Sequence, residues 1–184
     1  MEMSLVLGGF GGQGVQTIGK MITYGANEAD YYVTFLPSYG GAMRGGTSNC
    51  SVMISDEEIA SPTKQMVDCV IAMSQDALKE LSGRVRDGGT LVVNTSVINE
   101  VPELPGVKCI GIPVIEMAES CGSPKTMNVV MLGFFSELTG VIPTDVMYDV
   151  VMDKLGRKAQ FVEMNRKAFW LGVDHAKKAK GEVR

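Results

Sequence analysis

The glycine-rich segment from Gly8 to Gly14 constrains the fold of this chain more than any other feature. It reads Gly-Gly-Phe-Gly-Gly-Gln-Gly, follows the apolar run Met3 to Leu7 and precedes a helical pattern. Gly9, Gly11 and Gly14 fit the G-x-G-x-x-G spacing of a dinucleotide-binding strand, turn and helix. Bare backbone N–H groups at a helix N-terminus favour an anion such as phosphate. The segment therefore predicts an anion-binding turn, and tight strand-to-helix packing is the alternative interpretation of its glycines.

An ordinary dinucleotide site needs a second feature, an acidic residue about 20 residues later that holds a ribose hydroxyl. The expected second strand, Tyr31 to Leu36, ends in Phe35, Leu36 and Pro37 without an acid, and Asp30 lies before it. The sequence therefore disfavours a site of the usual NAD type.

Apolar and amphipathic segments alternate along the chain. Strand-like runs occur at residues 4–7, 31–36, 49–54, 69–73, 90–94 and 108–112. Helical patterns occur at residues 14–28, 75–81, 114–120, 128–139, 144–155 and about 162–180. Continuous apolar strands are typical of a sheet buried on both faces. We therefore expect one α/β domain over residues 1–184, with three layers around a mostly parallel, Rossmann-like sheet.

An antiparallel hairpin is expected in addition to the parallel strands. Residues 49–54 and 57–59 are strand-like, and the turn-prone pair Ser55-Asp56 separates them. This pattern predicts a short hairpin between the two segments.

Cysteine and histidine usage bears on metal sites and catalysis. The four cysteines contain no C-x-x-C pair, and there is one histidine; these residues are Cys50, Cys69, Cys109, Cys121 and His175. This pattern gives neither an iron–sulfur site nor a zinc site, and it does not support a Ser-His-Asp triad. We expect no metal ligands and no catalytic residues on this chain, and reduced cysteines in a cytoplasmic protein.

Charge and hydropathy bear on larger partners. Residues 157–184 hold eight Lys or Arg and three acidic residues, whereas the whole chain has a net charge of −4. The basic residues alternate with apolar ones at helical spacing, which indicates a helix with a solvated basic face. No apolar run is long enough to span a membrane. We expect no nucleic acid and no membrane as partners, and no signal peptide.

A second glycine-rich segment lies between the second and third expected strands. Residues 38–50 include Arg44, Gly45, Gly46 and Thr47, which offer a guanidinium, accessible backbone N–H groups and a hydroxyl. This combination suits phosphate or carboxylate. We expect the two glycine segments to share one rim of the sheet, and the alternative is that Arg44 only ties down its own loop.

The chain resembles the gamma subunits, or gamma domains, of the 2-oxoacid:ferredoxin oxidoreductases. The residues that carry the resemblance span nearly the whole chain in the family's order. They are Gly9 to Gly14, Tyr39-Gly40, Arg44 to Thr47, Ser55-Asp56, Ile59 to Pro62, Asp68 to Met73, Asn128, Leu132-Gly133, Asn165, Ala168-Phe169 and Gly172.

The resemblance also indicates a branch of the family. Gly41 and Ala42 stand where 2-oxoglutarate-type members usually have Pro and Glu, whereas Met43-Arg44 and Asn49-Cys50 match them. The match favours the 2-oxoglutarate or generic 2-oxoacid type over the pyruvate type.

The resemblance implies a subunit that is non-catalytic by itself. Enzymes of this family decarboxylate a 2-oxoacid such as pyruvate, 2-oxoisovalerate or 2-oxoglutarate on thiamine diphosphate, reduce ferredoxin through iron–sulfur clusters and form an acyl-coenzyme A. Thiamine diphosphate, magnesium and the clusters are then expected on partner subunits, with coenzyme A contacted by this chain. The expected cofactor-binding residues are Gly9, Gly11, Gly12, Gln13, Gly14, Tyr39, Arg44, Gly45, Gly46, Thr47 and Asn128. Two alternatives remain open: a stand-alone nucleotide-binding protein and a purely structural assembly subunit.

Overall fold

A six-stranded sheet forms the centre of the computed structural model, which describes residues 1–39, 47–156 and 159–181. Its strand order is β2-β3-β1-β4-β5-β6. The strands are β1 (Glu2–Phe10), β2 (Tyr32–Tyr39), β3 (Thr47–Ser55), β4 (Val67–Ala72), β5 (Val85–Asn94) and β6 (Lys108–Ile112). All six expected strands are present. The first is longer than expected, because Gly8 and Gly9 pair with Asn49 and Ser48 of β3 and so belong to the strand.

Six α-helices follow or join these strands, as expected. They are α1 (Val15–Glu28), α2 (Gln75–Leu81), α3 (Val114–Ser120), α4 (Met127–Thr139), α5 (Thr144–Leu155) and α6 (Ala159–Gly181). Two short 3-10 turns, η1 (Ser82–Arg84) and η2 (Pro124–Thr126), precede β5 and α4. No helix in the described ranges combines the length and the apolar composition needed to cross a membrane.

The sheet is mixed, and only β3 runs against the other strands. β1, β4, β5 and β6 pair in parallel, whereas β3 pairs antiparallel with both β1 and β2. β2 therefore runs in the same direction as β1, with β3 inserted between them. The Rossmann-like, mostly parallel sheet with an added antiparallel element is confirmed.

The location expected for the hairpin is wrong. Residues 57–59 form no strand, and β3 instead pairs with β2 on one side and β1 on the other. Both edges of β3 are thus occupied by neighbouring strands, so no further strand can pair with it. The turn-prone pair Ser55-Asp56 ends β3, where the Asp56 N–H donates to the carbonyl of Met1.

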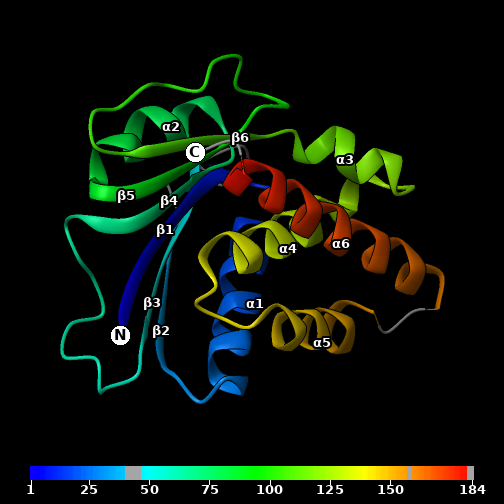
Figure 1. Ribbon diagram of the computed structural model, residues 1–184, viewed down its shortest axis with the longest axis horizontal. Helices are drawn as coiled ribbons and strands as arrows, with labels where there is room; N and C mark the ends of the chain where they lie inside the picture. The colour runs from blue at the N-terminus through cyan, green and yellow to red at the C-terminus, as the bar shows by residue number, and fades with distance from the viewer. Residues whose placement is uncertain (40–46, 157–158, 182–184) are drawn as a thin grey trace.

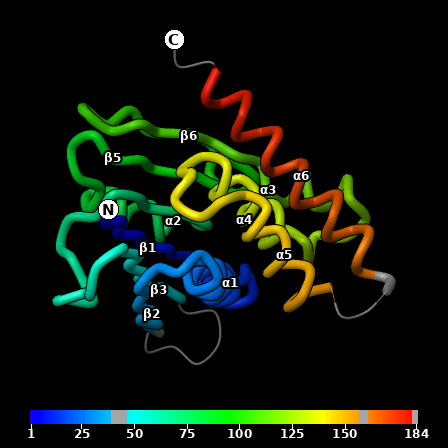
Figure 2. The backbone as a smooth tube through the Cα atoms, turned by 60° about the horizontal axis from the view of Figure 1, so that its bottom comes forward, coloured from blue at the N-terminus to red at the C-terminus, as the bar shows by residue number. Residues whose placement is uncertain are grey.

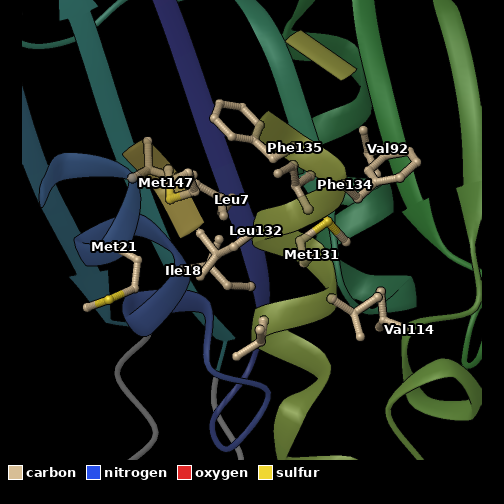
Figure 3. Packing of buried hydrophobic residues seen from close by; sticks show 14 of the residues in the cluster. Leu7, Ile18, Met21, Val92, Val114, Met131, Leu132, Phe134, Phe135 and Met147 are labelled. Carbon is tan, nitrogen blue, oxygen red and sulfur yellow. The ribbon is translucent and has the colours of Figure 1, made fainter. Parts of the chain in front are cut away.

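Helices cover the two faces of the sheet unequally (Figure 1). α2 lies on one face over a smaller cluster that includes Val6, Val70 and Leu91. α1, α4, α5 and α6 lie on the other face over the larger cluster, part of which is shown in Figure 3. The described chain therefore has the expected three-layer arrangement.

α4 is the central helix of the larger cluster. Every residue from Val129 to Ser136 is buried, which is typical of a helix covered on all sides. α6 runs beside it in both backbone views (Figures 1 and 2). A Cβ at Gly133 would collide with the carbonyl of Phe169, and one at Gly172 with the carbonyl of Val130. The two glycines thus allow the helix backbones to approach closely.

Candidate functional site

The turn between β1 and α1 leaves open space beside two of its glycines. A Cβ added at Gly11 or Gly12 would meet no atom of the chain within 4 Å, and both residues are exposed. Gly12 and Gly14 have φ angles of 98° and 75°, in the region that favours glycine. Gly14 is the N-cap of α1 and supplies no side-chain acceptor, so the first-turn amides of α1 stay available. The turn can therefore accept an anion on its backbone donors.

Gln13 holds this turn in place with both ends of its side-chain amide. Its Oε1 accepts the N–H of Phe10 at 2.7 Å, and its Nε2 donates to the carbonyl of Met73 at 2.8 Å. The backbone N–H of Gln13 donates to the carbonyl of Phe10 at 3.2 Å. Since that donor is occupied inside the turn, Gln13 positions the turn and does not offer its N–H to a ligand.

Gly9 and Gly14 have packing roles. A Cβ at Gly9 would lie 2.9 Å from the Cβ of Met73 and 2.9 Å from Cγ2 of Val15. A Cβ at Gly14 would collide with the side-chain amide of Asn128, the second residue of α4. The structure therefore brings Asn128 next to the turn, as expected for a site residue. The packing interpretation therefore applies to Gly9 and Gly14, whereas the anion-binding interpretation of Gly11 and Gly12 stays a prediction.

The end of β2 and the start of β3 lie at the same edge of the sheet as the turn between β1 and α1. Thr47 is the Cα partner of Phe10, and Tyr39 is the Cα partner of Ser48. The strand ends that flank the second glycine segment thus lie beside the first turn. The remaining expected residues of that segment lie outside the described residues; they are Arg44, Gly45 and Gly46.

The sequence interpretation missed Gln16, which links α1 to this edge. Its Nε2 donates to Oγ of Ser48 at 3.0 Å and to the carbonyl of Asn49 at 2.8 Å. Its Oε1 is buried without a hydrogen-bond partner. The bond fixes the start of β3 against the first turn of the helix. The position of Gln16 within the helix gave no signal of this role, because it depends on where β3 pairs.

A buried amide extends the network to the neighbouring strands. Asn94, fully buried at the end of β5, donates from Nδ2 to the carbonyl of Met73 at 3.3 Å. Its Oδ1 accepts the N–H of Ser96 at 3.1 Å, and Oγ of Ser96 accepts the N–H of Ile115. The carboxyl ends of β1, β4 and β5 and the start of α3 are therefore connected beside the candidate site.

Of the groups with shifted pKa values, Cys50 lies near the turn, where its thiol donates to the carbonyl of Val15 at 3.7 Å. Burial raises the pKa of Asp68, but hydrogen bonds from Ser4 and Arg86 outweigh it and hold the pKa below its usual range. Burial raises the pKa of Cys50 and Cys69 to about 12. Within the described ranges, no group of three or more His, Cys, Asp or Glu is placed to hold a metal ion.

One cavity of the described chain lies away from the turn. It measures about 580 Å³ and opens at the amino end of the sheet, lined by Asp68, Arg86 and Lys108 among others. Ligands of open α/β sheets bind at the opposite, carboxyl edge. We therefore place the candidate site at the exposed turn of Gly11 and Gly12, which offers bare backbone donors.

The fold and this turn define a Rossmann-like α/β protein with an open glycine turn at the N-terminus of α1. Comparison with known families makes the assignment more specific. The family model for pyruvate ferredoxin/flavodoxin oxidoreductase matches residues 4–175, and the chain belongs to this family.

Two curated relatives show how this domain is used in other chains. The chain is 32% identical over 179 residues to the ketoisovalerate oxidoreductase subunit VorA of Methanothermobacter marburgensis, covering 96% of this chain and 37% of that protein. It is 31% identical to the 2-oxoglutarate synthase subunit KorC of Methanocaldococcus jannaschii, covering 96% and 95%. The chain thus spans little more than a third of the first relative and nearly all of the second.

Two solved structures share the fold. A gamma subunit of a keto/oxoacid ferredoxin oxidoreductase from Geobacter sulfurreducens is 30% identical, with a TM-score of 0.85 and coverage of 97% and 98%. The 2-oxoglutarate:ferredoxin oxidoreductase of Magnetococcus marinus, solved with 2-oxoglutarate, coenzyme A and succinyl-CoA bound, is 25% identical with a TM-score of 0.87. This chain covers 31% of that longer protein and is itself covered to 96%.

Proposed function

We propose that this chain is the gamma-type subunit of a multi-subunit 2-oxoacid:ferredoxin oxidoreductase and that its glycine turn contacts coenzyme A. The observation that carries the proposal is the open space at Gly11 and Gly12, beside the uncapped N-terminus of α1. A structurally similar enzyme of this kind was solved with coenzyme A bound. Because coenzyme A carries phosphate groups, its chemistry matches the donors that this turn offers.

The substrate in this proposal is a 2-oxoacid of the 2-oxoglutarate type. The enzyme oxidatively decarboxylates the 2-oxoacid and transfers the acyl group to the thiol of coenzyme A, and ferredoxin accepts the electrons. The names of the relatives support the substrate class, since they include both 2-oxoglutarate synthase and ketoisovalerate oxidoreductase subunits.

Partner subunits hold thiamine diphosphate, magnesium and the iron–sulfur clusters in this proposal. The four cysteines support this division, because Cys50 and Cys69 are buried in separate strands and Cys109 and Cys121 lie in β6 and after α3. An iron–sulfur cluster needs several thiolates at one place. The described cysteines do not provide such a set, so we assign the clusters to other chains.

The residues that would hold coenzyme A divide into donors and positioning groups. The N–H groups of Gly11, Gly12 and the first turn of α1 donate to phosphate oxygens. Gln13 holds the turn through its hydrogen bonds, and Asn128 packs against Gly14. Gly9 and Gly14 allow the close packing that this requires. We further propose that the second glycine segment contributes Tyr39, Arg44, Gly45, Gly46 and Thr47, with Arg44 as the countercharge.

Replacing Gly11 with valine tests this function. Gly11 is exposed, lies in open space and does not have a positive φ, so a side chain fits there without strain but occupies the space of the ligand. In the assembled complex, Gly11→Val should raise the KM for coenzyme A about tenfold or more, since charge-assisted hydrogen bonds to phosphate are lost. Gly83→Val is the matched control, because Gly83 is equally open and exposed in η1.

Two outcomes would contradict the proposal. If Gly11→Val and the control had the same KM for coenzyme A, the turn would have no ligand and the chain would be a structural assembly subunit. If the purified chain had no partner subunits and bound a dinucleotide, it would be a stand-alone nucleotide-binding protein. Co-purification with mass spectrometry of the partners distinguishes these cases.

A further inference from the structure

Phe10 presents an exposed aromatic ring directly beside the open glycine turn. Its residue surface is 37% exposed, and it belongs to neither hydrophobic cluster of the described chain. The next two residues, Gly11 and Gly12, have no side chains and open space around them. A partly exposed aromatic residue therefore lies at the point where the candidate site begins.

The backbone of Phe10 is fixed on both sides. Its N–H donates to Oε1 of Gln13, and its carbonyl accepts the backbone N–H of the same residue. Phe10 is also the last residue of β1, opposite Thr47 of β3. The backbone that carries the ring is thus held in place, so less conformational entropy is lost when the ring makes a contact.

Strand alternation indicates where the ring projects. A Cβ at Gly8 would meet the Cβ of Ala77 in α2, whereas one at Gly9 would meet Val15 in α1. Successive residues of a strand face opposite sides, so Phe10 projects on the side of α2. The ring and the N-terminus of α1 therefore flank the turn from opposite faces of the sheet edge.

We propose that Phe10 stacks against the adenine base of a nucleotide whose phosphate is held by the turn; this inference rests on the proposed function. Phe10 and Gly12 are two residues apart, so their Cα atoms are at most about 7.6 Å apart. In a nucleotide, the ribose joins the base to the phosphate over a comparable distance. Purine rings stack favourably on aromatic side chains, which gives the exposed phenyl ring a partner.

Two nucleotides share this chemistry, coenzyme A and a free dinucleotide. Calorimetric titration of the assembled complex with coenzyme A, adenosine 3′,5′-bisphosphate, phosphopantetheine and NAD separates them. Phe10→Ala should weaken binding of coenzyme A and of the bisphosphate by roughly threefold to tenfold, because the stacking contact is lost. Phosphopantetheine has no base, so its binding should not change. If Phe10→Ala weakened the binding of NAD and of no other probe, the adenine base would belong to a dinucleotide.

Two variants serve as controls. Phe10→Tyr keeps an aromatic ring and should retain the binding of coenzyme A. Tyr32→Ala removes an aromatic side chain that is 55% exposed at the start of β2, away from the turn, and should also leave binding unchanged.

Three results would overturn the inference. They are unchanged binding of every probe by Phe10→Ala, weaker binding of phosphopantetheine alone, and a Phe10→Ala complex that loses its partner subunits on size-exclusion chromatography. The last result would make Phe10 a subunit contact. If Gly11→Val weakens coenzyme A binding while Phe10→Ala does not, only this inference fails; if neither does, the proposed function fails too.

Discussion

The side-chain amide of Gln13 donates a hydrogen bond of 2.8 Å to the backbone carbonyl of Met73, 60 residues away in the sequence. Asn94 donates to the same oxygen at 3.3 Å. Met73 itself follows β4 and donates its N–H to the carbonyl of Gly8. The turn that carries the candidate site is thus bonded directly to the adjoining strand and, through it, to the next.

Loss of the Gln13 amide should destabilise the chain. Gln13→Ala removes the bonds to the N–H of Phe10 and the carbonyl of Met73, so we expect a fall of about 1 to 3 kcal/mol in the free energy of unfolding. Urea denaturation followed by circular dichroism measures this. Gln75→Ala, at an exposed position in α2, should change the free energy by less than about 0.5 kcal/mol. Equal effects of both variants would show that the turn is held by other contacts.

Asp68 should make the stability depend on pH. Its Oδ2 accepts from the N–H and Oγ of Ser4, and its Oδ1 accepts from Nε of Arg86. Although burial raises its pKa, these bonds lower it more, so the folded-state pKa lies below the unfolded-state value of about 3.9. The stabilisation is therefore complete above that value and is lost as the pH falls through the folded-state pKa.

The variant Asp68→Asn measures this contribution. It should be less stable than the native chain by about 1 to 3 kcal/mol at pH 7, and the difference should shrink on acidification below about pH 4. Urea unfolding at a series of pH values gives both numbers. Asp149→Asn, an exposed position on α5, is the control. A difference that stays constant down to pH 3 would contradict the assigned role of the carboxylate.

The contact between α4 and α6 should not tolerate a methyl group. Gly133→Ala places a Cβ against the carbonyl of Phe169, so the helices must move apart and the chain should lose about 1 to 3 kcal/mol of stability. Thermal unfolding would detect this as a lower Tm. Gly181→Ala, where the added Cβ meets open space at the end of α6, should leave the Tm unchanged or slightly higher.

The four cysteines should differ in reactivity. Cys50 and Cys69 are each only 1% exposed, and burial raises the pKa of both thiols to about 12, so little thiolate forms at pH 8. Cys109 and Cys121 are partly exposed. Brief iodoacetamide treatment followed by mass spectrometry should modify the latter pair first. Early labelling of Cys50 or Cys69 would indicate that their strands open readily.

Local pattern was sufficient for most of the secondary structure. The expected bounds of α2, α3, α5 and β6 coincide with those observed, because apolar spacing marks them and Pro143 and Gly156 flank α5. The hairpin was wrong because the turn signal at Ser55-Asp56 does not say which strand β3 pairs with. That choice depends on β1 and β2, which are distant in sequence.

The candidate site shows the same division. The glycine spacing indicated an anion-accepting turn, and family resemblance indicated Asn128. The sequence could not distinguish the open glycines, Gly11 and Gly12, from the packed ones, Gly9 and Gly14. The packed glycines are defined by their contacts with Met73, Val15 and Asn128, which only the tertiary structure shows.

By itself, the sequence determined most of the elements, the α/β class and the turn, because these follow from the period of apolar residues and the conformational freedom of glycine within short segments. Only the tertiary structure decided the reversed direction of β3, the bonds of Gln13 and Asn94 to one carbonyl oxygen, and the exposure of Phe10. The first two features join residues that are tens of positions apart, and the third depends on how other segments pack around Phe10. All three are therefore determined by hydrogen bonding and packing between distant segments.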